Sequence, residues 1–173
     1  EPFEIGRALI GTERLCANFI RDPKFISYMF DTYAKFLAEC GKSLIDAGVD
    51  GLWSWGDIAY RDGPFIGPVH YRKLLAPAHR KIFSVFRKRG LPVILHTDGD
   101  VRPLIPDFIE SGVTALQPLE AKAGMDVREL KEKYGDQIAF IGNMDARALS
   151  GTLEDVKGEV LSKVPIACEG GGY

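Results

Sequence analysis

The stretch VILHTDGD, residues 93–100, places three apolar residues directly before His96, Asp98 and Asp100. An uninterrupted apolar run is typical of a buried strand in a parallel sheet, and the polar residues mark its carboxyl end. Ligands bind at this end of the strands in parallel α/β proteins. His96 and Asp98 are two residues apart, so their side chains should point to the same side of an extended chain.

The same succession of helix, glycine and short apolar strand recurs along the chain. We predict strands within residues 49–57, 92–99, 114–120, 138–145 and 165–171, and helices at 22–47, 70–89, 101–111, 126–134 and 152–164. Asp22 and Thr152 suit the N-caps of the first and last of these helices. Pro77 should break or kink the second helix. This alternation predicts an α/β fold with a parallel sheet.

Polar residues gather at the carboxyl ends of all the predicted strands. They are Asp57, His96, Asp98, Gln117, Glu120, Asn143, Asp145 and Glu169. Five such strands in succession favour a barrel over an open sheet, but a closed (β/α)8 barrel needs at least about 200 residues. Either strands lie outside these 173 residues or the sheet is open. EPFEIG at the start resembles the exit from a strand, so a piece of a longer protein is expected.

Composition and charge argue against some classes of function. The net charge is −2 and the pI is near 6.0, which argues against nucleic acid as the main partner because phosphate contacts need a cationic surface. No apolar run approaches the roughly 20 residues of a membrane span. The three cysteines are scattered and form no CxxC motif, so we expect a reducing, cytoplasmic location.

Several stretches, taken in order, carry a resemblance to a known family. They are EPFEIGRALIG, DPKF, WGDIAYRDGPFIGPVHYRKLLAPAHRKI, PVILHTDGD, ALQPLEAKAGMDVRELKEKYG, IGNMD and GGGY. The ordered set resembles the uroporphyrinogen decarboxylase superfamily, whose fold is an eight-stranded (β/α) barrel. The resemblance implies that residues 1–173 form a single domain, the middle part of that barrel, with about five central β/α units. Such an incomplete barrel has open sheet edges, which favours association, so a homodimer is an expectation.

One chemistry of this superfamily is zinc-assisted methyl transfer between a corrinoid protein and a thiol. Members of that branch end the strand matched here in His-x-Cys, and both residues bind zinc. His96 matches the histidine, whereas Asp98 stands where the cysteine would be, which makes a harder ligand set. The resemblance therefore implies a divalent metal, zinc in the first place, held by His96, Asp98 and a residue outside this chain. The implied partner is a corrinoid protein or a small-molecule methyl acceptor.

Two other functions stay open. The decarboxylase branch removes carboxyl groups from the acetate arms of uroporphyrinogen without a metal or cofactor. Gly142-Asn143-Met144-Asp145 resembles the GNLDP stretch of that branch, whereas Ala8 stands where its members tend to carry tyrosine. The third hypothesis is a non-catalytic barrel that binds a ligand without turnover. His96 favours the methyltransferase, which is our main hypothesis.

Residue roles follow from these hypotheses. The candidate catalytic residues are Asp57, His96 and Glu120; the candidate substrate-binding residues are Trp55, Gln117, Asn143 and Asp145; and the candidate metal ligands are His96 and Asp98. Each has a plainer alternative. His96 could form a hydrogen bond that fixes a loop, Glu120 could be a solvated loop acid, and Asp145 could cap a helix. The Trp55 side chain could line a pocket or pack in the core.

Overall fold

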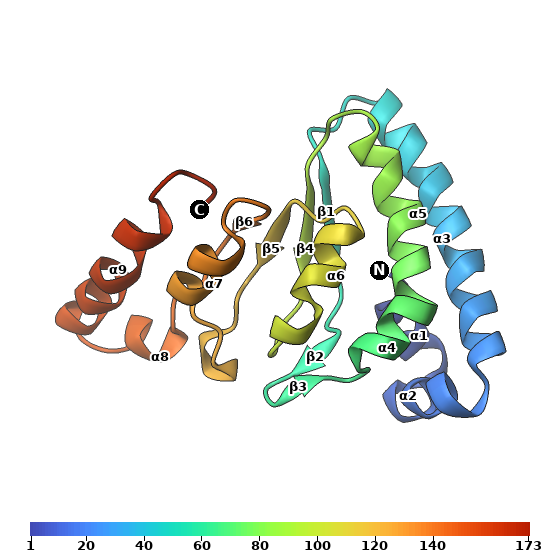
Figure 1. The fold of residues 1–173 in the computed structure, drawn as a ribbon, viewed down its shortest axis with the longest axis horizontal. Helices are drawn as coiled ribbons and strands as arrows, with labels where there is room; N and C mark the ends of the chain where they lie inside the picture. The colour runs from blue at the N-terminus through green and yellow to red at the C-terminus, as the bar shows by residue number, and fades with distance from the viewer.

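The computed structural model describes residues 1–173 and is built on a four-stranded parallel sheet with the order β1-β4-β5-β6 (Figure 1). The strands are β1 Leu52–Trp55, β4 Val93–His96, β5 Ala115–Gln117 and β6 Ala139–Phe140. All three pairings between neighbouring strands are parallel. The predicted α/β class with a parallel sheet is therefore confirmed.

Helices precede and connect the strands. They are α1 Pro2–Ile10, α2 Thr12–Arg21, α3 Pro23–Asp46, α4 Pro68–His70, α5 Ala76–Arg87, α6 Ile105–Glu110, α7 Val127–Tyr134, α8 Ala146–Leu149 and α9 Leu153–Ala167, with short 3-10 helices at Arg102–Leu104 and Ala121–Ala123. In Figure 1, α3 and α5 run side by side along one flank of the sheet, and α8 and α9 lie at the opposite end, beyond β6.

The two faces of the sheet differ in what covers them. On β4, Val93 and Leu95 are fully buried, whereas Ile94 and His96 are half-buried. Residues paired in register point to the same face, and Trp55 pairs with His96, which pairs with Gln117. Trp55 is 53% exposed, so this face has no helix packed over it. A parallel sheet with helices on one face is the wall of a (β/α) barrel, and residues 1–173 form part of one.

The predicted fifth strand is wrong. Helix α9 continues through Pro165 to Ala167, and turns follow it. Proline removes one N–H from a helix and crowds the carbonyl one turn earlier. The helical pattern nevertheless resumes after Pro165, because Cys168 N donates to the Val164 carbonyl over 2.9 Å. Ala167 is fully buried, which holds this last turn against the core. The chain therefore carries four of these strands, one fewer than predicted.

The chain start also differs from the prediction. EPFEIG forms the first turns of helix α1 and is not the exit from a strand; Glu1 accepts a hydrogen bond from Glu4 N at 2.8 Å and caps the helix. Pro2 occupies the first helical position, where its missing N–H costs nothing. A cap and a proline at this spacing are helix signals that the strand interpretation overlooked.

Other local predictions are confirmed. Asp22 caps α3 through Phe25 N at 3.0 Å, and Thr152 forms a capping box with Asp155 at the start of α9. The helix disturbance predicted at Pro77 appears as a π-helical turn over Tyr71–Leu75, immediately before α5. Between the predicted strand at 49–57 and the predicted helix at 70–89, the chain forms a small hairpin of β2 Ala59–Tyr60 and β3 Gly63–Pro64.

A continuous hydrophobic core joins these layers, from Phe3 on α1 to Ala167 on α9. Among the helices, none is both long and apolar enough to cross a lipid bilayer.

Candidate functional site

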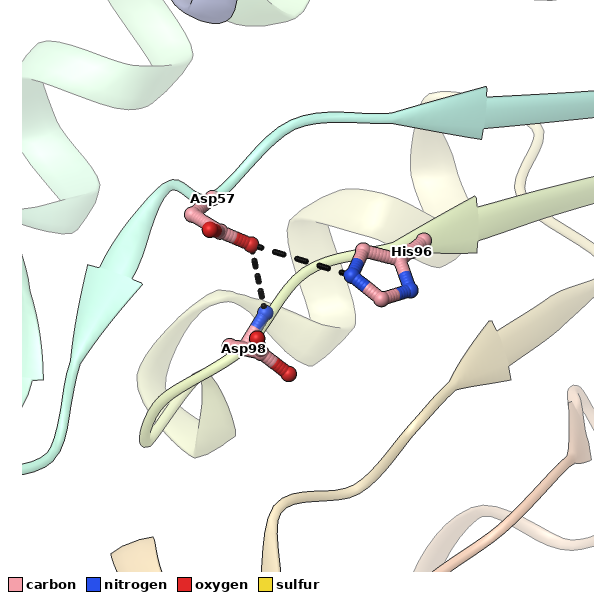
Figure 2. Close-up of side chains that lie close together, drawn as sticks. All are labelled: Asp57, His96 and Asp98. Carbon is pink, nitrogen blue, oxygen red and sulfur yellow. Dashed lines mark hydrogen bonds and ion pairs between the residues drawn. The ribbon is translucent and has the colours of Figure 1, made fainter.

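The carboxyl ends of β1 and β4 bring three candidate residues together (Figure 2). Asp57 follows β1, His96 ends β4, and Asp98 lies two residues further on. One potential ligand atom from each lies within 4.8 Å of the others. Sequence reasoning placed the third metal ligand outside the chain, whereas the structure brings Asp57, predicted only as a catalytic acid, into the cluster.

The orientation of His96 is set by Gln117 on the next strand. The His96 Nδ1 atom lies within hydrogen-bonding distance of Gln117 Oε1. An amide oxygen only accepts, so Nδ1 carries a proton, and in the neutral ring Nε2 keeps its lone pair. That lone pair faces Asp57 Oδ1 at 3.8 Å (Figure 2). Two acceptors face each other here, an arrangement that a cation or a shared proton would stabilise.

Backbone contacts hold the loop after β4 against the loop after β1. Asp98 N donates to Asp57 Oδ1 at 3.1 Å, and Ile58 N donates to Thr97 Oγ1 at 3.0 Å. Gly99 has a φ of 86°, and a Cβ there would lie 2.6 Å from the Tyr60 carbonyl. Glycine is therefore required in VILHTDGD, because no other residue tolerates both the conformation and the close approach.

Negative charge is concentrated around Asp98. Partial burial raises the pKa of the Asp98 carboxyl, and the Asp57 carboxylate raises it further. Glu120 adds a smaller contribution of the same sign, while His96 opposes it. Glu120 lies outside the three-donor cluster, and its Oε2 accepts a hydrogen bond from Gly99 N at 2.9 Å. The negative charge at this strand end would favour a positively charged ligand.

A cavity of about 400 Å³ opens beside the cluster. Its lining joins Asp57, Asp98 and Glu120 to Arg7, Tyr60, Arg61, Phe65 and Lys122. Arg7 comes from α1 and Tyr60 and Phe65 from the β2–β3 hairpin region, and sequence reasoning did not select them. No local pattern marks these residues, because they meet only through the packing of α1 on the hairpin. Trp55 lies beside His96, with its ring centroid 6.2 Å from that of His96.

Asn143, predicted to bind substrate, is instead engaged in the core. Its side chain is 2% exposed, and its Nδ2 donates to the carbonyls of Leu119 and Met125, each at 2.7 Å. Its Oδ1 accepts from Val127 N at 3.0 Å. All side-chain hydrogen-bonding groups of Asn143 are thus committed to three backbone segments, and the residue ties loops together.

Asp145 lies apart from the cluster as well and has the plainer of its two predicted roles. Its side chain accepts from Arg147 N at 2.9 Å and caps α8. The Arg147 guanidinium also binds the carboxylate and lowers the pKa of Asp145 to about 2. The structure therefore brings together Asp57, His96 and Asp98, with Gln117, Glu120 and Trp55 beside them, and separates Asn143 and Asp145 from them.

Known proteins resemble this chain along almost its whole length. A family model described as Uroporphyrinogen decarboxylase (URO-D) matches residues 2–171. Curated relatives include the uroporphyrinogen decarboxylases of Chlorobium phaeovibrioides (strain DSM 265 / 1930) and Chlorobium luteolum (strain DSM 273 / BCRC 81028 / 2530), which are 24% and 23% identical over 144 residues. The match covers 80% of this chain and 38% of each relative.

A solved structure, described as a methyltransferase from Methanosarcina mazei, shares the fold with a TM-score of 0.77 and 22% sequence identity. The similarity covers 98% of this chain and 48% of that one. The chain thus spans less than half the length of the proteins it matches. Since the family model matches residues 2–171, the chain belongs to the uroporphyrinogen decarboxylase (URO-D) family.

Proposed function

We propose that the protein containing this chain is a metal-assisted methyltransferase of the URO-D family, acting with a corrinoid protein and a thiol or similar acceptor. Asp57, His96 and Asp98 would hold the divalent ion, zinc in the first place. The observation that carries the proposal is the orientation of His96, whose Nδ1 is engaged by Gln117 and whose Nε2 faces the Asp57 carboxylate at 3.8 Å. The methyltransferase among the structural neighbours agrees with this choice but supports the fold alone.

The three donors fit a divalent cation. Ligand bonds to zinc are about 2.0–2.2 Å for imidazole nitrogen and carboxylate oxygen, so donors on one ion lie about 3–4.5 Å apart, and the donors here fall within 4.8 Å of one another. One imidazole and two carboxylates suit zinc, manganese or iron(II) better than a soft metal. A bound cation would also offset the mutual repulsion of Asp57 and Asp98 that raises the pKa of Asp98.

Each residue would then have a defined task. When bound, the metal would supply Lewis acidity, which lowers the pKa of a coordinated thiol and makes it a better nucleophile. Gln117 would engage Nδ1 and so hold the His96 ring with Nε2 directed at Asp57. Glu120 holds the backbone of Gly99 and so shapes the loop that carries Asp98. The adjacent cavity of about 400 Å³ is the space in which the acceptor would lie.

The test uses the whole protein, purified without chelator, beside its His96→Ala variant. We expect about one metal ion per chain in the parent and none in the variant. Methyl transfer from methylcobalamin to a thiol, followed by the absorbance change of the corrinoid, should be lost with the metal. Asp145→Asn is the matched control, because Asp145 lies at a strand end but outside the cluster, and it should keep both metal and activity. A metal-free parent protein would refute the proposal.

A second candidate is metal-free decarboxylation of a tetrapyrrole. The two Chlorobium relatives are named uroporphyrinogen decarboxylases, and Asp57 is an acid in the cavity lining that could stabilise positive charge on pyrrole rings. Incubation with porphyrinogens in the presence of a chelator separates the two functions, since only the decarboxylase would keep its activity. Retention of a bound ligand with neither reaction would point to the non-catalytic barrel.

A further inference from the structure

A second histidine–carboxylate network lies buried behind the end of β1. His79 on α5 and Glu1 at the start of α1 both have fully buried side chains, with Nε2 and Oε1 2.7 Å apart. On the other side of the ring, His79 Nδ1 lies 2.8 Å from the hydroxyl of Tyr71, which is also fully buried. Tyr71 belongs to the π-helical turn before α5. None of these residues belongs to the three-donor cluster.

The charge on Glu1 sets the direction of its hydrogen bond with His79. Burial opposes ionisation of Glu1, but the hydrogen bond and charge interaction with His79 outweigh it and hold the pKa of Glu1 below its ordinary value. Glu1 is therefore a carboxylate that accepts from His79 Nε2–H, and in the neutral ring His79 Nδ1 accepts from the Tyr71 hydroxyl. The second oxygen of Glu1 accepts from Glu4 N at 2.8 Å, at the positive end of helix α1.

Helix α1 lies directly against the residues that carry Asp57. Gly56 precedes Asp57, and a Cβ at Gly56 would lie 2.5 Å from Glu1 Oε2. Arg7, on the same helix, donates to the Asp57 carbonyl at 3.4 Å. Glu1 therefore lies directly against the backbone that leads into Asp57.

We propose that the Tyr71–His79–Glu1 network positions Asp57 by locking the start of α1 against Gly56. Glu1 and His79 touch no ligand in this proposal and act as positioning residues. The placement of Asp57 itself rests on the contacts described here, and only its consequence for metal binding rests on the proposed function.

The placement of Asp57 can be measured in the metal-free whole protein. Asp98 N–H donates to Asp57 Oδ1, so amide hydrogen exchange at Asp98, followed by NMR, reports whether Asp57 is in place. In Glu1→Ala we expect exchange to accelerate by up to about tenfold, the equivalent of one hydrogen bond. Glu1→Gln, which keeps an acceptor of the same shape, should restore most of the protection, and Tyr71→Phe should give an intermediate rate.

Phe86→Leu is the matched control, because Phe86 lies on the same helix as His79 and its ring packs against Gly41 on α3. It should lower the melting temperature without a selective change at Asp98. An unchanged Asp98 rate in Glu1→Ala, or an equal acceleration in Phe86→Leu, would overturn the proposal. If Glu1→Ala does not fold, the comparison of Tyr71→Phe with Phe86→Leu decides in the same way.

Cobalt(II) is the probe for the metal-binding consequence. We expect Glu1→Ala to bind cobalt roughly tenfold more weakly, at the lower end of the cost of losing an outer-shell partner, with an altered visible spectrum because a displaced Asp57 changes the coordination. Wild-type affinity in Glu1→Ala would contradict this consequence. If the wild-type protein binds no cobalt, the metal-assisted function fails, and the exchange measurement still decides the role of the network.

Discussion

His79 and His96 each lie beside a carboxylate, yet the two environments have opposite characters. Both ring nitrogens of His79 are hydrogen-bonded, at 2.7 Å to Glu1 and 2.8 Å to Tyr71, and its side chain is fully buried. His96 has only Nδ1 committed, its Nε2 lies 3.8 Å from Asp57, and its side chain remains 20% exposed.

The difference shows what distinguishes a structural histidine from a candidate ligand. The groups around His79 satisfy one another, so nothing further can bind there without breaking a bond. Around His96, three potential ligand atoms lie within 4.8 Å of one another and a cavity adjoins the cluster. A histidine next to an acid is therefore weak evidence for a ligand site by itself. Stronger evidence is a ring nitrogen that makes no hydrogen bond.

The largest expected effect concerns His79, the structural histidine of this comparison. His79→Ala leaves the Glu1 carboxylate buried without its partner and should lower the free energy of unfolding by about 3–5 kcal/mol. Thermal and urea unfolding of the whole protein measure this loss. His96→Ala serves as the control and should change stability by less than about 1 kcal/mol, because His96 is only partly buried and only its Nδ1 makes a hydrogen bond. Similar losses in both variants would remove the distinction between the two histidines.

The second prediction concerns the group that orients His96. Gln117→Ala frees the ring to rotate and should weaken zinc binding by about 10-fold, since outer-shell partners of metal-bound histidines contribute of that order. Isothermal titration with zinc gives the dissociation constant. Gln117→Glu keeps an acceptor for Nδ1 and should retain or improve the affinity. Unchanged binding in Gln117→Ala would show that Gln117 does not set the orientation.

The third prediction uses the pKa of Asp98, which burial and the Asp57 carboxylate raise above the ordinary 3.8. A raised carboxyl pKa means that the folded state disfavours the charged form. The contribution of Asp98 to the stability of the folded state is therefore most favourable at low pH. It is lost as the pH rises from about the ordinary pKa through the raised pKa. Metal-free Asp98→Asn should therefore gain stability over the wild type as the pH increases across this range, measured by melting temperature. A constant difference between the two proteins would contradict the shift.

Zinc should reverse the pH trend of the wild type. Binding needs the ionised Asp98 carboxylate, so affinity should increase with pH over the same range. The Asp98→Asn variant, which has no such group to ionise, should bind weakly with a flatter pH dependence.

The smallest expected effect concerns Asp145, a strand-end acid outside both histidine clusters. Asp145→Ala removes the cap of α8 and the pairing with Arg147, so a slight decrease in melting temperature is expected, with unchanged zinc affinity. A loss of zinc affinity would place Asp145 in the functional site and contradict its assignment as a helix cap.

The sequence by itself determined the class of the fold and most of its local elements. Apolar runs, glycines and caps such as Asp22 and Thr152 act over a few residues, so the parallel strands at β1, β4 and β5 and the start of α9 could be predicted from them. The same reasoning failed at Pro165. A proline locally predicts the end of a helix, whereas α9 continues on both sides of Pro165. His96 and Asp98 could be selected together because they are two residues apart on one strand.

Only the tertiary structure decided which polar strand ends meet. Asp57 and Asp98 are 41 residues apart, and the register between β1 and β4 brings them together. Asn143 follows a strand in the same way as Asp57, yet it has a φ of 62° and its side chain turns into the core. Polar residues that follow different strands look alike in the sequence. The hydrogen bonds that make one a candidate ligand and another a structural residue come from segments far apart along the chain. That physical difference explains why the strand ends could be predicted while the composition of the site could not.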